Sequence, residues 1–150
     1  MWQLEHTVYW QDNRKQCVAA ALQMLLSSTG LAVPSQTAIV DELDGADGAT
    51  DYDMVVFLRR RFCYAEIDVY GNHVIRRLQK LVDQPAGIIL GINPRTWRNR
   101  RSAHAVFVSG MDARCALISD PLRPYRAQVP WDVLRGAVGS AVVLVNKEKR

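Results

Sequence analysis

The spacing of the apolar residues changes part-way along the chain, and this change limits the available folds more than any other feature. Residues 17–28 (CVAAALQMLLSS) combine strong helix formers with apolar residues at helical spacing. Residues 35–43 and 51–62 are predicted as two further helices, the first with Ser35 as its N-cap. The second half is mainly extended, with one helix predicted at about 72–82. The predicted strands are 64–70, 86–92, 103–110, 115–119, 125–129 and 140–145.

A helix-rich first half followed by a strand-rich second half predicts an α+β fold, with helices packed against an antiparallel sheet. Residues 4–10 are predicted as a short extended segment, and Gly30 is predicted to end the first helix. A chain of this length buries about 68–70% of the surface that it exposes when unfolded, enough for a core without metal or disulfide staples. We therefore expect one domain over residues 1–150, with a site where the helices meet the sheet.

The three cysteines argue against a disulfide framework and against a zinc site. Cys17, Cys63 and Cys115 are odd in number and show neither a CxxC motif nor the spacing of a zinc site. We therefore expect a reducing compartment, no metal and no cofactor, with Cys63 and Cys115 as ordinary core cysteines. The chain has no apolar run of about 18 residues and no signal peptide at its N-terminus. We expect no membrane segment, and a protein that is cytoplasmic or exported without a signal peptide.

The net charge of +4 comes mainly from three basic clusters, at residues 59–61, 95–101 and 147–150. Nucleic-acid binding would need aromatic platforms beside such charge, and only Trp97 interrupts the basic stretch. We therefore expect no nucleic-acid partner. Residues 93–101 are predicted to border the cleft of the site expected between the helices and the sheet, where they could bind acidic groups of a substrate or a partner.

Cys17 stands at the first position of the helix predicted over residues 17–28. Backbone N–H groups and the helix dipole at a helix N-terminus favour a thiolate, and the charges of Arg14 and Lys15 add to this effect. A thiolate is the nucleophile of thiol-dependent acyl transfer. The alternative is an ordinary buried helix cysteine, but the polar segment that leads up to Cys17 favours a nucleophile.

Gln11 lies six positions before Cys17, on the polar connection that leads into the helix. A side-chain amide at this position can fold back toward the thiol. Together with the backbone N–H of Cys17, it could hold the oxyanion that develops when a carbonyl is attacked. Gln16, directly before the cysteine, is a competing candidate, although its side chain is expected to point elsewhere as the helix begins.

His104 begins the apolar segment HAVFVSG, and Asp120 ends the segment CALISD, directly before Pro121. If these segments form a hairpin around residues 111–114, both side chains lie at the ends away from the turn and come close together. A neutral imidazole there could take the thiol proton, and the carboxylate could hold the ring in its working tautomer. Each residue also has a plainer explanation, because a histidine can simply begin a strand and an Asp-Pro pair forms turns.

The other histidines and the second aspartate of the hairpin are weaker candidates. His6 and His73 do not precede a strand that leads to a suitably placed acid. Asp112 belongs to the predicted tip of the hairpin, too far from the ring of His104. The predicted catalytic residues are therefore Cys17, His104, Asp120 and Gln11.

Four stretches, Q-x5-C, AAALQMLL, SAHAVFVSGMD and LISDP, together resemble the papain-like peptidases that process bacteriocin leaders, also called double-glycine peptidases. The resemblance covers nearly the whole chain, including a helix start at Pro130–Trp131 and the closing strand SAVVLV. It implies a papain-like fold and a cysteine peptidase that cleaves a peptide or protein substrate, after a small-residue or double-glycine motif. The family's oxyanion glutamine, nucleophilic cysteine, histidine and orienting aspartate correspond to Gln11, Cys17, His104 and Asp120.

Two positions depart from the family's pattern. Val18 and Ala103 stand where family members usually have glycine, and both add bulk near the cleft. Many relatives are fused to a peptide exporter, whereas this sequence shows no membrane segment, so we expect a stand-alone enzyme that could work with a partner protein or a secretion system. Two alternatives stay open: an effector or toxin that uses the same thioester chemistry as a deamidase or acyltransferase, and a catalytically silent domain that binds peptides.

Overall fold

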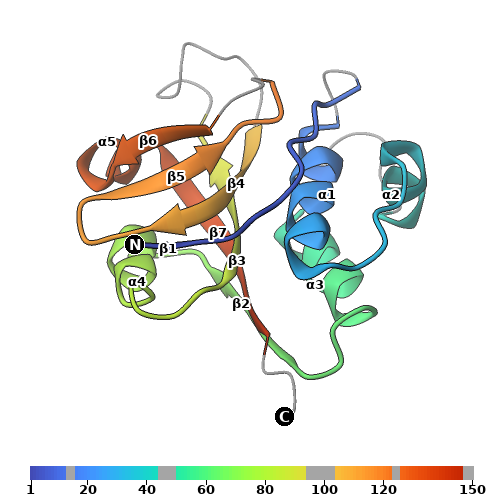
Figure 1. The fold of residues 1–150 in the computed structure, drawn as a ribbon, viewed down its shortest axis with the longest axis horizontal. Helices are drawn as coiled ribbons and strands as arrows, with labels where there is room; N and C mark the ends of the chain where they lie inside the picture. The colour runs from blue at the N-terminus through green and yellow to red at the C-terminus, as the bar shows by residue number, and fades with distance from the viewer. Residues whose placement is uncertain (13–15, 44–49, 94–103, 123–125, 147–150) are drawn as a thin grey trace.

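The computed structural model describes residues 1–12, 16–43, 50–93, 104–122 and 126–146 (Figure 1). Its helices are α1 (Cys17–Thr29), α2 (Gln36–Glu42), α3 (Asp51–Arg59), α4 (Val74–Gln79) and α5 (Trp131–Arg135). Its strands are β1 (Trp2–Gln3), β2 (Ala65–Tyr70), β3 (Gly87–Ile92), β4 (His104–Met111), β5 (Cys115–Ser119), β6 (Arg126–Pro130) and β7 (Val138–Asn146). The predicted α+β class is confirmed, with helices packed on an antiparallel sheet.

The strands form one sheet in the order β2-β7-β3-β4-β5-β6, and every pairing is antiparallel. The short strand β1 pairs with the last two residues of β4, beyond the part of β4 that β3 covers. At this point a Cβ on Gly110 would lie 2.6 Å from the carbonyl oxygen of Trp2, so the close approach of β1 requires glycine. The N-terminal segment is thereby fixed against β4.

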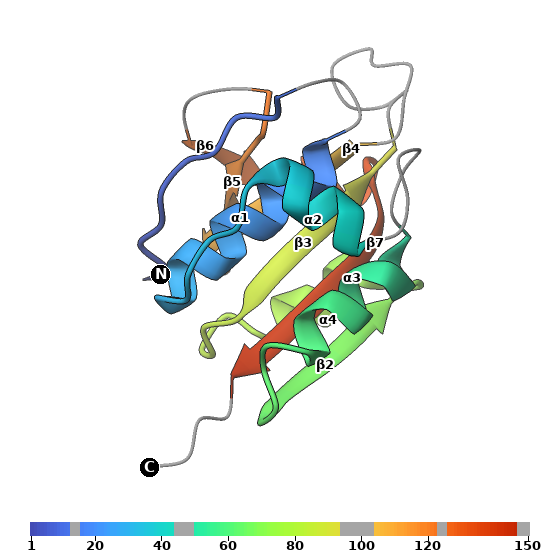
Figure 2. The same ribbon diagram turned by 90° about the vertical axis from the view of Figure 1, so that its right-hand side faces the viewer.

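Helices cover both faces of the sheet. Helices α1 and α3 pack on one face, with α2 against the outer side of α1, while α4 and α5 lie on the other face (Figures 1 and 2). Successive residues of the central strands therefore enter different cores: Ile89 packs with α1 and α3, whereas its neighbours Ile88 and Leu90 pack with α4 and α5. Burial on both faces explains why β4 is buried along its whole length and has an almost continuously apolar sequence.

Local signals in the sequence fix the ends of the first two helices. Gly30 follows α1 with a φ of 79°, a left-handed conformation that favours glycine, and its N–H donates to the carbonyl of Ser27. The side chain of Ser35 accepts a hydrogen bond from the N–H of Ala38 at the start of α2. The helix stop and the N-cap predicted at these two residues are both confirmed.

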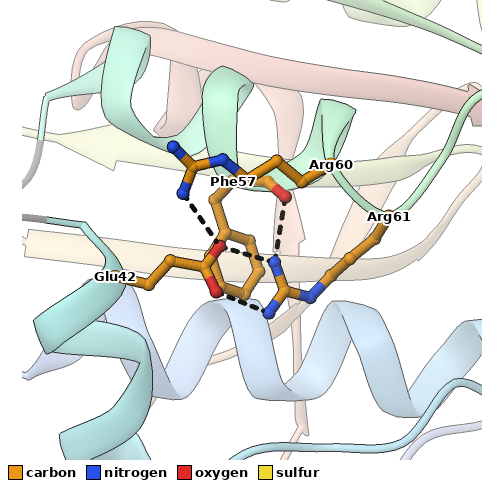
Figure 3. A network of polar contacts seen from close by, with 4 residues as sticks. All are labelled: Glu42, Phe57, Arg60 and Arg61. Atoms are coloured by element: carbon orange, nitrogen blue, oxygen red, sulfur yellow. Dashed lines mark hydrogen bonds and ion pairs between the residues drawn. The ribbon is translucent and has the colours of Figure 1, made fainter.

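Part of the basic cluster at residues 59–61 holds α2 against α3 (Figure 3). The guanidinium of Arg61 donates to both carboxylate oxygens of Glu42, at 2.6 and 2.8 Å, and stacks on the ring of Phe57 at 3.8 Å. Arg60 lies 3.6 Å from the same carboxylate and is mostly exposed. The fork of Arg61 matches the carboxylate in two places and its stem is partly buried, so this residue makes the stronger link between the helices.

Residues 4–10 belong to no helix or strand, and the N–H of Leu4, directly after β1, donates to the carbonyl of Ser109. Two predictions about the fold need correction. The helix predicted at about 72–82 is only α4, since the chain turns directly after residue 79. Cys63 is exposed and Cys115 is half-buried, so neither is a core cysteine. In the turn after α3, Phe62 enters the core instead of Cys63.

Candidate active site

Cys17 is the first residue of α1 and is only 7% exposed. Its helix packs on β4, the strand that begins with His104. Gln16 is the N-cap residue, and its side chain makes no capping hydrogen bond. The start of α1 therefore presents the sulfur together with the positive end of the helix dipole.

The predicted hairpin of β4 and β5 brings His104 and Asp120 together at its open end, beyond a register shift between Val108 and Gly110. The imidazole Nε2 lies 2.6 Å from Oδ1 of Asp120, and the two residues are 6% and 3% exposed. An ionised carboxylate only accepts hydrogen bonds, so Nε2–H donates and Nδ1 is the ring nitrogen left for the sulfur of Cys17. The same Oδ1 accepts from the N–H of Leu122 at 2.9 Å, so Asp120 also forms the turn before Pro121.

The surroundings of His104 favour the imidazolium form. Burial opposes the charge and is the largest single influence on the pKa of this ring. The hydrogen bonds to Asp120 and to Cys17, followed by the charges of the same two groups, together outweigh burial and raise the pKa. This buried ring, beside a carboxylate and a thiol, is therefore protonated more readily than an ordinary imidazole.

Gln11 reaches the same corner of the molecule from the N-terminal segment. Its backbone N–H donates to the carbonyl of Pro121 at 2.9 Å, directly after Asp120. The side-chain oxygen of Gln11 is buried, so its amide turns into the protein. The side-chain oxygen of Gln16 is also buried, and within the described ranges it has no hydrogen-bond partner. Both glutamines precede α1 in the chain, and of the two it is Gln11 whose backbone bonds the turn after Asp120.

The weaker candidates lie in different surroundings. His6 bonds Ser119 Oγ and Arg126, and burial, reinforced by the charge of Arg126, lowers its pKa to about 4. His73 precedes α4, on the face of the sheet opposite α1. Asp112 accepts backbone hydrogen bonds at the tip of the hairpin, at the end away from His104.

Two buried glutamines near the site were missed by the sequence analysis. Gln23 and Gln36 are 6% and 4% exposed, and their side-chain amides bond each other at 2.9 Å. Gln23 stands in the interior of α1 among apolar residues, and a glutamine at such a position is the one signal that could have marked it. Gln36 gave no signal, because it stands in the first turn of a short polar helix.

Several predicted features lie outside the described residues. These are the charges of Arg14 and Lys15, the basic stretch at 95–101 with Trp97, and Ala103. No group of three or more acidic, cysteine or histidine side chains suited to a metal ion occurs among the residues that the structure describes. In that same part of the chain, no helix combines the length and apolar character needed to cross a membrane.

Residues 3–139 match the sequence model of the Peptidase C39 like family. The chain belongs to this family. No curated protein sequence matches it. Val18, which departs from the glycine usual in double-glycine peptidases, is half-buried and packs on the apolar cluster beneath α1. The extra bulk at this position is therefore at least partly absorbed by the helical core.

Three solved structures have a similar fold. The peptidase domain of Streptococcus ComA, a bifunctional ABC transporter of a quorum-sensing pathway, aligns with a TM-score of 0.74 and 16% identity, over 95% of this chain and 100% of that domain. A double-glycine-motif protease from an AMS/PCAT transporter, solved with its leader peptide, gives 0.71 and 21% over 95% and 92% of the two chains. A C39-like peptidase from Bacillus anthracis gives 0.67 and 15% over 98% of both chains. The papain-like C39 peptidase fold is thereby confirmed.

Proposed function

We propose that this C39-like protein is a cysteine peptidase, built as one domain over residues 1–150. The observation that carries the proposal is the buried hydrogen bond of 2.6 Å between His104 and Asp120, on a ring whose pKa Cys17 also raises. A nucleophile, a base and a group that orients the base are the parts that thiol-dependent acyl transfer requires. Membership in a peptidase family supports the same chemistry.

In the proposed reaction, the Cys17 thiolate attacks the peptide carbonyl carbon and the carbonyl electrons move to oxygen. The oxyanion accepts hydrogen bonds from the backbone N–H of Cys17 and the side-chain amide of Gln11. His104 gives its proton to the amine as the C–N bond breaks, which leaves a thioester. The ring then takes a proton from water, the hydroxide attacks the thioester, and the acid and the free thiol are released.

The substrate that we propose is a peptide cut after a double-glycine or similar small-residue motif. One structural neighbour is a double-glycine-motif protease solved with its leader peptide, and the fold shared with that enzyme supports the choice. The same thioester could also be formed from a side-chain amide, with ammonia as the leaving group. Proteolysis and deamidation therefore differ in their products and not in their first step.

Mass spectrometry of the products tests the proposal. The protein is incubated with a synthetic leader-like peptide that contains Gly-Gly and with a matched peptide in which Val-Val replaces it. We expect two shorter fragments from the first peptide alone, and none with the Cys17→Ala variant. A product of unchanged length, with one amide converted to an acid, would mean that the protein is a deamidase and not a peptidase. Fragments that still form with the Cys17→Ala variant would contradict both activities, because each depends on the Cys17 thiol.

A further inference from the structure

The side-chain amide of Gln36 bonds the chain on both sides of Gln11. Its Oε1 accepts a hydrogen bond from the N–H of Asp12 at 2.8 Å, and its Nε2 donates to the carbonyl of Trp10. The preceding carbonyl and the following N–H of a residue are the two groups that a parallel neighbouring strand would bond. The side chain of Gln36 thus replaces a strand neighbour at Gln11.

A second contact holds Gln11 from the other side. Its backbone N–H donates to the carbonyl of Pro121, which follows Asp120 in the chain. The short segment 10–12 is therefore fixed between α2, through Gln36, and the turn after β5. These are side-chain and loop contacts only, because segment 10–12 belongs to no helix or strand.

Gln36 is itself anchored to the helix that begins with Cys17. Its Nε2 also donates to Oε1 of Gln23 at 2.9 Å, and Nε2 of Gln23 donates to the carbonyl of Pro34 at 2.9 Å. Gln23 stands in α1, six residues after Cys17. Buried amides are costly unless they are hydrogen-bonded, and these two bond each other and the backbone. Together they form a rigid link between α1 and the segment that carries Gln11.

We propose that Gln36 is a positioning residue for catalysis, which fixes the backbone around Gln11 so that the Gln11 amide meets the oxyanion. This inference rests on the proposed function, because it assigns Gln11 as the oxyanion donor. Gln36 itself does not touch the reacting atoms. An oxyanion donor acts through its preset geometry, and a displacement of about 1 Å can lower a rate about 100-fold.

The test compares two reactions of Cys17, of which only the first forms an oxyanion. In the reaction with p-nitrophenyl acetate, the thiolate attacks the ester carbonyl, an oxyanion forms, the bond to p-nitrophenolate breaks, and an acetyl thioester is left on Cys17. Alkylation by iodoacetamide displaces iodide from a saturated carbon and forms no oxyanion. Intact-mass spectrometry with peptide mapping follows both products on Cys17. Loss of the Gln36 link should slow the first reaction and spare the second.

We expect Gln36→Met, which keeps the side-chain size but removes the amide, to lower the acetylation rate of Cys17 about 10- to 100-fold. The matched control is Ser35→Ala, which removes the N-cap of the same helix without touching the amide of Gln36. This control should acetylate within about 2-fold of wild type. The double variant Gln11→Ala with Gln36→Met should be no slower than Gln11→Ala alone, because Gln36 acts through Gln11.

Three results would overturn the inference: acetylation of Gln36→Met at the wild-type rate, an equal loss of alkylation in that variant, or a double variant whose defect is the product of the two single defects. Failure of the proposed function has a different signature. In that case wild-type Cys17 is acetylated no faster than Cys17 in the His104→Ala variant, and the Gln36 comparison has no activity to lose.

Discussion

Two histidines bind consecutive residues of β5 and the turn after it, yet they lie in opposite electrostatic surroundings. His6 bonds Ser119 and the guanidinium of Arg126, whereas His104 bonds the carboxylate of Asp120. An arginine only donates hydrogen bonds, so Nδ1 of His6 must accept and the ring must be neutral. The pKa of His6 is about 4, while that of His104 is raised above its ordinary value. Burial lowers the pKa of His6 and the charge of Arg126 lowers it further, whereas at His104 the hydrogen bonds and charges of Asp120 and Cys17 outweigh burial.

We expect the largest difference between the two histidines in the rate of peptide cleavage, when each ring is removed in turn. His104→Ala should lower the rate of peptide cleavage about 10³- to 10⁴-fold, because both the base and the acid of the reaction are lost. His6→Ala should lower it by less than about 10-fold, because the contacts of this ring are with Phe107, Ser119 and Arg126. The measurement is kcat/KM on one peptide for both variants. An equal loss of kcat/KM in the two variants would contradict a catalytic role that belongs to His104 and not to His6.

A smaller effect is expected when the carboxylate is replaced without removing its shape. Asp120→Asn keeps an oxygen for the N–H of Leu122 but removes the charge beside His104. We expect kcat to fall about 10²- to 10³-fold, since the imidazolium loses its stabilising partner. Asp112→Asn is the matched control at the far tip of the hairpin, with an expected change of less than about 2-fold. A similar loss in both variants would mean that the hairpin needs its aspartates only for folding.

The two rings should also affect the pH dependence of folding with opposite signs. The pKa of His6 falls from 6.5 in the unfolded chain to about 4 in the fold, so its contribution is present above pH 6.5 and is lost as the pH falls toward 4. The ring is only half-buried, and after a discount for solvent screening we expect about 1 kcal/mol. Urea unfolding at pH 7 and at pH 4.5 measures it, and His6→Gln should reduce the difference between the two values.

The contribution of His104 runs the other way. Its pKa is raised in the fold, so the stability that it adds is fully present below pH 6.5 and is lost as the pH rises through the folded value. His104→Gln should therefore flatten the stability profile above pH 6.5 and leave the acid side unchanged. If this variant instead altered the acid side, the direction of the shift at His104 would be wrong.

The smallest expected effect concerns the cation beside His6. Arg126→Gln removes a positive charge that lowers the pKa of His6, so that pKa should rise, while burial still holds it below 6.5. The titration of His104 should not change, because its partners are Asp120 and Cys17. Histidine proton resonances followed by NMR against pH give both values. An unchanged His6 titration would show that burial alone sets its pKa.

Local patterns in the sequence predict much of this molecule. A hairpin around residues 111–114 brings together the strand ends that carry His104 and Asp120, whereas the register shift between Val108 and Gly110, which sets the face that each side chain takes, is no part of that prediction. Gly30 and Ser35 mark helix ends because each satisfies or shapes the nearby backbone. Their roles depend on neighbours within a few residues, and such roles are readable from sequence.

Long-range contacts were not predictable in the same way. The amide pair of Gln23 and Gln36 joins two helices to the segment around Gln11, and no spacing rule connects these positions. The apolar neighbours of Cys63 predict a core residue, yet the direction of the turn after α3 exposes its side chain. The roles of Cys17, His104, Asp120 and Gln11 in catalysis stay a prediction. Geometry brings groups together, and only chemistry shows what they do.

The central claim is that His104 activates Cys17, and competition between two cysteines tests it most directly. Cys17 is 7% exposed and Cys63 is exposed, so access alone favours Cys63. Limiting iodoacetamide is added at about pH 6, where an ordinary thiol is almost fully protonated. If His104 activates Cys17, we expect Cys17 to be alkylated first and His104→Ala to abolish this preference. Alkylation of Cys63 ahead of Cys17 in the wild-type protein would contradict it.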